Sequence, residues 1–243
     1  MPEIALRATG ITAGYRPELP ILQDVSMEAR RGSVTVIIGP NGAGKSTLIK
    51  AIAGIVPVSA GQVTWNGADI THLRPDRMAG HGIAYVPQTN NIFRTLTVRQ
   101  NLDLALRQEA DKQARLAALL AQFPVLAERL ASKAGALSGG QRQFLAVAMA
   151  LATGPGLVLM DEPSAGLAPK AAQEVLEQAR ALTETGVTIL LVEQNVTQAL
   201  RLADHCYILA DGRNQIDGSA AELLGSPAVA EIYLGGKRLR AGA

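Results

Sequence analysis

The most restrictive feature of this 243-residue chain is a glycine-rich loop that directly follows a short β-branched segment. Residues 34–38 are VTVII, and residues 39–47 are GPNGAGKST. The loop fits the pattern GxxxxGK[ST] in the context that this pattern requires, with a strand before it and a helix after it. A short run without alternation of apolar and polar residues predicts a strand buried on both faces, as in a parallel sheet. This feature therefore favours a fold with a covered, largely parallel sheet.

Two further segments repeat the strand pattern, and a helical pattern separates them. Residues 157–160 (LVLM) and 187–192 (VTILLV) also lack alternation. Between them, residues 170–183 carry apolar side chains at a spacing of about 3.6 residues, which predicts an amphipathic helix. The apolar positions of that helix are Ala172, Val175, Leu176, Ala179 and Leu182. This order of strands and helices predicts βαβ units and an α/β fold.

Two parts of the chain depart from the βαβ pattern. Segments 4–11 and 21–29 alternate apolar and polar residues, which predicts an antiparallel sub-sheet near the N-terminus. No glycine occurs between Ile83 and Ala134, where residues that favour helices are abundant. We therefore expect a mixed sheet with an N-terminal antiparallel sub-sheet and a mostly helical insertion.

Composition narrows the class of protein further. The chain is 48% hydrophobic and 18% charged, which is typical of globular proteins rather than disordered or coiled-coil chains. A net charge of +2 argues against a broad nucleic-acid-binding surface. The single cysteine, Cys206, excludes an intramolecular disulfide. The longest apolar run, residues 144–152, falls far short of the roughly 20 residues of a membrane span, and the N-terminus lacks a signal-peptide pattern.

The glycine-rich loop predicts a phosphate site. Glycines let backbone N–H groups converge on phosphate oxygens, and the following helix adds its positive N-terminal dipole. The Lys45 ammonium can reach the β- and γ-phosphates of a nucleotide, and the Ser46 hydroxyl can bind Mg²⁺. A glycine-rich turn without a ligand is the alternative. The expected nucleotide-binding residues are Gly39, Pro40, Asn41, Gly42, Ala43, Gly44, Lys45, Ser46 and Thr47.

Two carboxylates, Asp161 and Glu162, follow the predicted strand 157–160. The carboxyl ends of parallel strands are where open α/β sheets bind ligands. We expect Asp161 to hold Mg²⁺ through water, and Glu162 to accept a proton from an attacking water. The alternative is an ordinary acidic turn at the end of a strand.

Residues 137–141 (Leu137, Ser138, Gly139, Gly140 and Gln141) precede an amphipathic segment that extends to about Leu151. Locally they form a capping box, with Ser138 at the N-cap and Gln141 at the third helical position. A capping role alone would explain why Ser138 and Gln141 stand at these positions. Two consecutive glycines weaken a helix, however, and they leave its N-terminus open to an anion.

Together these elements resemble the ATP-binding cassette (ABC) ATPases, from Leu6 to about Leu234. The resemblance implies a P-loop NTPase core at 1–88 and 156–234, a helical subdomain at 89–155 and a flexible tail at 235–243, all within one ABC ATPase domain, 1–243. It also implies a head-to-tail dimer, in which the LSGGQ signature at 137–141 acts on the nucleotide of the partner.

Further residues match family motifs. Tyr15 matches the aromatic that stacks on adenine, although a strand-end tyrosine is the alternative. Gln88 matches the glutamine that contacts Mg²⁺ and senses the membrane partner, although it could be an ordinary loop amide. Residues 164–167 (SAGL) match the loop that crosses the dimer.

Three segments narrow the resemblance to one subgroup: GLAP at 166–169, VEQN at 192–195 and IYLGG at 232–236. They look like the ATP-binding subunits of bacterial importers for branched-chain amino acids, which have relatives for amides and urea. The resemblance implies a peripheral subunit on the cytoplasmic face of the inner membrane that hydrolyses ATP. Its partners would be permease subunits, a second ATPase subunit or a second copy, and indirectly an extracytoplasmic solute-binding protein, with no nucleic acid. A lipid or lipopolysaccharide exporter and a non-transport assembly ATPase are the alternatives.

Two positions depart from the wider family. Most members carry Asp where Ala168 stands and His where Gln194 stands. We expect Gln194 to face the γ-phosphate and to take part in catalysis with Glu162 and Lys45. A neutral amide cannot carry a positive charge or shuttle protons as histidine can, so we expect a slow site.

Overall fold

A six-stranded mixed sheet forms the centre of the protein, with the strand order β10-β9-β3-β8-β7-β6. The computed structural model describes residues 3–16, 18–224, 226 and 229. Strands β9, β3, β8, β7 and β6 are parallel, and β10 joins the edge antiparallel to β9. These strands are β3 (Val34–Ile38), β6 (Ile83–Val86), β7 (Leu157–Asp161), β8 (Thr188–Val192), β9 (His205–Ala210) and β10 (Arg213–Ser219).

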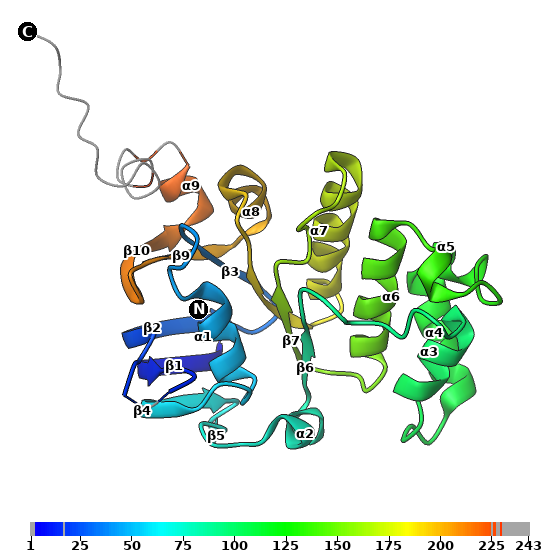
Figure 1. Ribbon diagram of the computed structural model, residues 1–243, viewed down its shortest axis with the longest axis horizontal. Helices are drawn as coiled ribbons and strands as arrows, with labels where there is room; N and C mark the ends of the chain where they lie inside the picture. Colours follow the sequence, from blue (N-terminus) through cyan, green and yellow to red (C-terminus); the bar gives the residue numbers. More distant parts are fainter. Residues whose placement is uncertain (1–2, 17, 225, 227–228, 230–243) are drawn as a thin grey trace, which may run out of the picture.

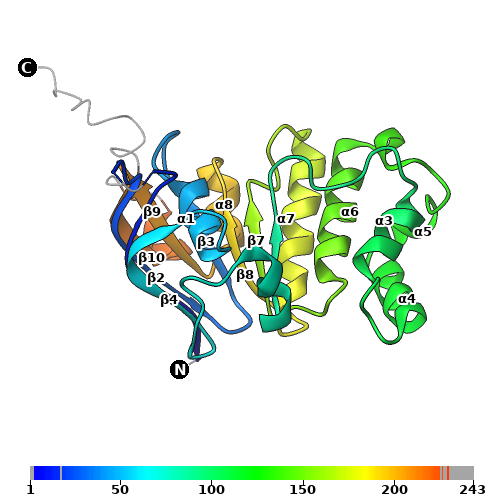
Figure 2. The ribbon, with the colours of Figure 1, turned by 60° about the horizontal axis from the view of Figure 1, so that its bottom comes forward.

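A second, four-stranded antiparallel sheet lies beside the central one, with the order β2-β1-β4-β5. Figure 2 shows it at one end of the molecule, with the helical part at the other. Its strands are β1 (Ile4–Ala13), β2 (Leu22–Arg30), β4 (Val58–Trp65) and β5 (Ala68–Asp69). The antiparallel sub-sheet that the sequence predicted near the N-terminus is confirmed.

Helices cover the central sheet and extend beyond it. In both views α3, α4 and α5 lie at the end of the molecule away from the antiparallel sheet, and α6 lies between them and α7 (Figures 1 and 2). The helices are α1 (Lys45–Ile52), α2 (Pro75–Met78), α3 (Val98–Ala105), α4 (Lys112–Gln122), α5 (Pro124–Ala127), α6 (Gly139–Leu151), α7 (Pro169–Thr183), α8 (Val196–Leu202) and α9 (Ala220–Leu223), with 3-10 turns at Ala79–His81 and Ala134–Ala136.

Each face of the central sheet packs into its own hydrophobic core. On β3, Val34, Val36 and Ile38 face the core that the helices α6, α7 and α8 complete. Ile37 faces the opposite core, which α1 and the antiparallel sheet complete. All five residues of β3 are buried, as expected for a strand covered on both sides.

The predicted mixed α/β fold is confirmed, with small shifts at the boundaries of elements. Strand β8 begins at Thr188 rather than Val187, because the Thr188 amide is the first to be held, by the Gly156 carbonyl at 2.8 Å. Strand β2 begins at Leu22 rather than Ile21, whose side chain is 36% exposed. All five apolar positions predicted for the helix at 170–183 are buried in α7.

Other predictions concern the ends and the subdivision of the chain. No helix in the described part of the chain combines the length and apolarity that a membrane span requires. The expected flexible tail at 235–243 and the IYLGG segment lie outside the described residues. The division into a core and a helical subdomain at 89–155 stays a prediction.

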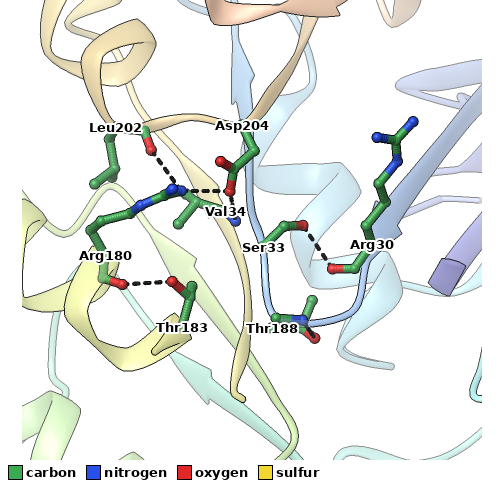
Figure 3. Close-up of polar contacts among 9 residues, drawn as sticks. Arg30, Ser33, Val34, Arg180, Thr183, Thr188, Leu202 and Asp204 are labelled. Atoms are coloured by element: carbon green, nitrogen blue, oxygen red, sulfur yellow. Dashed lines mark hydrogen bonds and ion pairs between the residues drawn. The ribbon is translucent and has the colours of Figure 1, made fainter. Parts of the chain in front are cut away.

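A polar cluster holds the starting end of β3 (Figure 3). The Arg180 guanidinium on α7 donates to the Asp204 carboxylate, which also accepts the Val34 amide at 2.9 Å. In the preceding turn, the Ser33 hydroxyl donates to the Arg30 carbonyl at 2.7 Å. These bonds fix α7 and two strands at one end of the sheet, so that the loop at the other end of β3 begins from a rigid position.

The turn between β9 and β10 packs against the glycine-rich loop through Gly212. Its amide donates to the Ala43 carbonyl at 3.2 Å, and its carbonyl accepts the Gln23 amide at 2.9 Å. Gly212 has φ of 71°, and an added Cβ would lie 1.9 Å from the Ile21 carbonyl oxygen. Only glycine fits this close approach of backbone to backbone.

We expect Gly212→Ala to destabilise the protein more than a glycine substitution in open space. Gly186 is the matched control, because its φ is 88° and an added Cβ would have no neighbour within 4 Å. Gly186→Ala should lower the free energy of unfolding by about 1–2 kcal/mol from backbone strain alone. Gly212→Ala should lower it by roughly 1–3 kcal/mol more, because the backbone must shift. Urea unfolding measures both, and equal losses would contradict the packing role of Gly212.

Candidate functional site

The glycine-rich loop opens into a cavity of about 330 Å³ at the N-terminus of α1. The N-cap of α1 is Gly44, with φ of 95°, and no side chain caps the helix. Backbone N–H groups at an uncapped helix N-terminus are donors suited to an anion. The cavity is lined by Ile21, Asn41, Gly42, Ala43, Gly44, Lys45, Ser46, Thr47, Glu162 and Gln194.

Two glycines of the loop have different reasons to be glycine. A Cβ on Gly39 would lie 2.1 Å from the Leu209 carbonyl oxygen, so this residue allows the loop to pack on β9. A Cβ on Gly42 would meet nothing within 4 Å, although its φ of 81° is left-handed. Gly42 therefore serves the turn of the loop and leaves the space above it free for a ligand.

Lys45 is the buried cation of the site, at 5% exposure. Its ammonium donates to the carbonyl oxygens of Gly39 at 2.8 Å and Pro40 at 3.0 Å. Burial lowers the pKa of Lys45, whereas the charges of Glu162 and Asp161 oppose that shift. A phosphate group would add negative charge beside this ammonium and favour its protonated form.

Asp161 ends β7 and is 2% exposed. Its carboxylate accepts the Ser46 hydroxyl at 2.8 Å and the Tyr85 hydroxyl at 3.3 Å, and the Lys50 ammonium lies 3.6 Å away. Burial raises the pKa of Tyr85, and the charge of Asp161 raises it further, so the phenol stays protonated as a donor. The adjacent hydroxyl of Ser46 and carboxylate of Asp161 are oxygen ligands of the kind that Mg²⁺ binds.

Glu162 lies at the meeting point of several elements. Both of its carboxylate oxygens accept the Gln194 amide at 2.9 Å, and one also accepts the Gln88 amide at 2.7 Å. The residue has φ of 49°, a left-handed conformation that is strained for a side chain other than glycine. Such strain at a buried carboxylate is typical of functional sites.

A second cavity, of about 360 Å³, is also lined by Glu162. Glu162 and Gln194 line both cavities, so the cavity at the glycine-rich loop and the cavity at the loop 164–167 share these two residues. The second cavity is lined by Glu162, Ser164, Ala165, Leu167, Pro169, Ala172, Glu193, Gln194, Asn195 and Gln198.

The LSGGQ segment lies outside both cavities. The Ser138 hydroxyl accepts the Gln141 amide, and the Gln141 side chain accepts the Ser138 amide, so the predicted capping box is confirmed. A Cβ on Gly139 would lie 2.8 Å from Leu167, and one on Gly140 would lie 3.1 Å from Ala171. The two glycines thus also allow α6 to pack closely against α7 and the loop before it.

Sequence reasoning placed most of the site but left three residues without a role. The structure brings Gln88, Asp161, Glu162 and Gln194 together with the glycine-rich loop, whereas Tyr15 is 60% exposed in the turn after β1 and lines neither cavity. The unassigned residues are Lys50 and Tyr85, which contact Asp161, and Glu193, which is 2% exposed. The sequence signal that could have identified Glu193 is its position, because it is a charged residue directly after an apolar strand. The individual catalytic and binding roles stay predictions.

Comparison with known proteins identifies the family. The family model described as "ABC transporter" matches residues 22–165, which include the glycine-rich loop, the LSGGQ segment and the carboxylates of β7. The chain belongs to the ABC transporter family. As a member of this family it binds ATP and is an ATPase that drives transport across a membrane, as the sequence predicted.

Relatives within the ABC transporter family match this cassette over most of its length. The probable branched-chain amino acid transport ATP-binding protein LivF of Archaeoglobus fulgidus is 46% identical, over 90% of this chain and 94% of the relative. The high-affinity branched-chain amino acid transport ATP-binding protein BraG of Pseudomonas aeruginosa is 40% identical, over 91% and 96%. The lipopolysaccharide export system ATP-binding protein LptB of Escherichia coli is 34% identical, over 95% and 97%.

Solved ABC cassettes share the fold. The ADP conformation of an ABC transporter cassette is 31% identical and superimposes with a TM-score of 0.84, over 96% of this chain and 99% of that one. A dimeric post-hydrolysis cassette bound to ADP and phosphate is 25% identical, with a TM-score of 0.76, over 88% and 98%. The predicted ABC ATPase fold is therefore confirmed.

Proposed function

We propose that this cassette is the ATP-hydrolysing subunit of an importer for branched-chain or related amino acids. The observation that carries the proposal is the 46% identity to LivF along 90% of the chain. The subunit would lie on the cytoplasmic face of the inner membrane, bound to permease subunits and supplied by an extracytoplasmic binding protein. The loop that begins at Gln88 connects the sheet to the helical part, so it can contact both the nucleotide site and a permease.

A lipopolysaccharide exporter is the second candidate, because LptB is 34% identical over 95% of the chain. The lower identity favours the importer. A non-transport assembly ATPase has no comparable support among these relatives.

Purification of the tagged chain from native membranes tests the proposal. We expect integral permease subunits to co-purify and the ATPase rate of the complex to rise when an amino-acid-loaded binding protein is added.

Crosslinks from residues 89–97 to the permease should change with nucleotide. Co-purification with lipopolysaccharide-transport proteins would support the second candidate, and crosslinks confined to the C-terminal tail would contradict the assigned contact loop.

We propose for the site residues the roles that the sequence predicted. The ammonium of Lys45 would stabilise the β- and γ-phosphates, while the loop amides and α1 hold the phosphate oxygens. Ser46, Asp161 and Gln88 would hold Mg²⁺, which neutralises phosphate charge when bound. Glu162 would orient the attacking water and accept its proton. Tyr15 would stack on the adenine.

Hydrolysis by this arrangement needs a second cassette. No arginine lines the phosphate cavity in the described part of the chain, so positive charge and donors on the far side of the γ-phosphate must come from elsewhere. Ser138 is exposed at the N-terminus of the thirteen-residue helix α6. We propose a head-to-tail dimer, of two copies or with a second subunit, in which residues 137–141 face the nucleotide of the partner. The dimeric cassette among the solved relatives supports this proposal.

Ser138→Arg should block dimer closure while leaving ATP binding nearly unchanged. The longer, charged side chain would occupy the helix N-terminus and remove the hydroxyl that caps it. We expect the ATPase rate to fall about 10²-fold or more, as on loss of a group that stabilises the transition state. Ser59→Arg, at an exposed position of β4, is the control. Sedimentation under turnover conditions measures the oligomeric state of the variant. A Ser138→Arg protein that is monomeric and keeps full ATPase activity would contradict the proposed dimer.

Gln194 is the feature that we expect to slow this site. Its amide bonds both oxygens of Glu162, and Gln88 bonds one of them, so an attacking water must compete for these acceptors. The amide also cannot carry the positive charge of a histidine near the γ-phosphate. We propose that the site is the slower of two unequal sites, and that a second ATPase subunit with a histidine supplies the faster one.

Gln194→His in the isolated chain should raise its ATPase rate, by about threefold to tenfold, with unchanged ATP affinity. The range is small because positioning already accounts for most of phosphoryl-transfer catalysis. Gln113→His, on the exposed surface of α4, controls for an added histidine. A rate that falls or stays level at unchanged affinity would show that glutamine is sufficient at this position.

A further inference from the structure

Glu193 is a buried carboxylate to which the sequence assigned no role. It follows β8 directly and is 2% exposed. One carboxylate oxygen accepts the Ser164 amide at 3.1 Å. The other accepts the Ser164 hydroxyl at 2.8 Å and the backbone amide of Gln194 at 3.3 Å. Burial raises the pKa of Glu193, and the hydrogen bonds from Ser164 oppose that shift.

These bonds hold the strained turn that carries Glu162. The turn is closed by the Glu162 amide, which donates to the Val192 carbonyl at 3.0 Å, and by the Ala165 amide, which donates to the Glu162 carbonyl at 3.1 Å. Ser164 lies two residues after Glu162 and is tied to Glu193 through both its amide and its hydroxyl. A left-handed non-glycine residue persists only where its surroundings determine its conformation, and Glu193 provides part of that constraint.

Glu193 also fixes the residue that contacts the Glu162 carboxylate. Its backbone amide donates to the Ile37 carbonyl of β3 at 3.1 Å, which anchors it to the strand that leads into the glycine-rich loop. The next residue, Gln194, donates to both oxygens of Glu162. A single buried side chain therefore connects the loop at 164–167, the backbone amide of Gln194 and the turn of Glu162.

We infer that Glu193 is a positioning residue for ATP hydrolysis. Its carboxylate locks the loop at 164–167 to the end of β8. This holds the Glu162 carboxylate and the side-chain amide of Gln194 in their relative positions. Glu193 does not line the cavity at the glycine-rich loop. The inference rests on the proposed role of Glu162 as general base. The competing explanation is a buried hydrogen-bonding group that supports the fold alone.

Glu193→Gln is the first test. Glutamine has about the same size but only one acceptor oxygen, so it cannot accept the Ser164 amide and hydroxyl on separate oxygens. We expect kcat to fall about tenfold or more, with KM for ATP and ATP affinity within about twofold, because a group that positions the base acts on the chemical step. Glu174→Gln, which neutralises an exposed carboxylate of α7, should match the wild type.

A pair of substitutions at Ser164 tests the same contact without touching the buried charge. Ser164→Ala removes the hydroxyl, and Ser164→Thr restores one. We expect Ser164→Ala to lower kcat and Ser164→Thr to recover most of it, at equal unfolding midpoints in urea. The double variant Glu193→Gln/Ser164→Ala should be no slower than Glu193→Gln, because both changes break one interaction.

The outcomes separate the inference from the proposed function. Glu162→Gln should abolish hydrolysis and retain ATP binding; if it stays active, the general-base assignment fails. If Glu162→Gln is inactive while Glu193→Gln has the wild-type kcat, only the positioning role is wrong. Additive effects of Glu193→Gln and Ser164→Ala on kcat would also overturn the positioning role. Equal kcat values for Ser164→Ala and Ser164→Thr would do the same. If Glu193→Gln fails to fold, the comparison at Ser164 decides.

Discussion

Four charged side chains are buried where the parallel strands of the central sheet end, and the rest of the site depends on how their charges are satisfied. Lys45, Asp161, Glu162 and Glu193 are between 2% and 6% exposed. A buried charge is tolerated only when hydrogen bonds or opposite charges replace the water that it loses. Loop carbonyls satisfy Lys45, hydroxyls satisfy Asp161, amides satisfy Glu162, and Ser164 satisfies Glu193. Each of these partners must therefore be held in place by the fold.

The order of the strands supplies that placement. Strand β8 lies between β3, which leads into the glycine-rich loop, and β7, which ends in Asp161. Gln194 follows β8, and its side-chain amide donates to Glu162 where both residues line the phosphate cavity. The backbone repeats the connection, because the Glu162 amide donates to Val192 and the Glu193 amide donates to Ile37. Movement of one strand end would therefore disturb all three, which suits a site that couples nucleotide chemistry to motion.

The separation of the LSGGQ segment from the cavities has a physical consequence. In one chain this segment caps α6 and packs against Leu167, and none of its residues lines the cavity at the glycine-rich loop. The same segment would complete the cavity of a partner in the proposed dimer, so assembly and catalysis would depend on one surface.

The sequence by itself determined the elements and the chemical types of the site. Runs such as 34–38 and 157–160 identified buried strands, the period of 170–183 identified the buried face of α7, and Ser138 with Gln141 identified a helix cap. These are local signals, carried by residues within a few positions of each other. Only the tertiary structure decided which strand lies between β3 and β7, that Tyr85 and Lys50 surround Asp161, and that Glu193 holds Ser164. The physical reason is distance along the chain: Ser46 and Asp161 are 115 residues apart, and only the packing of the whole sheet makes them neighbours.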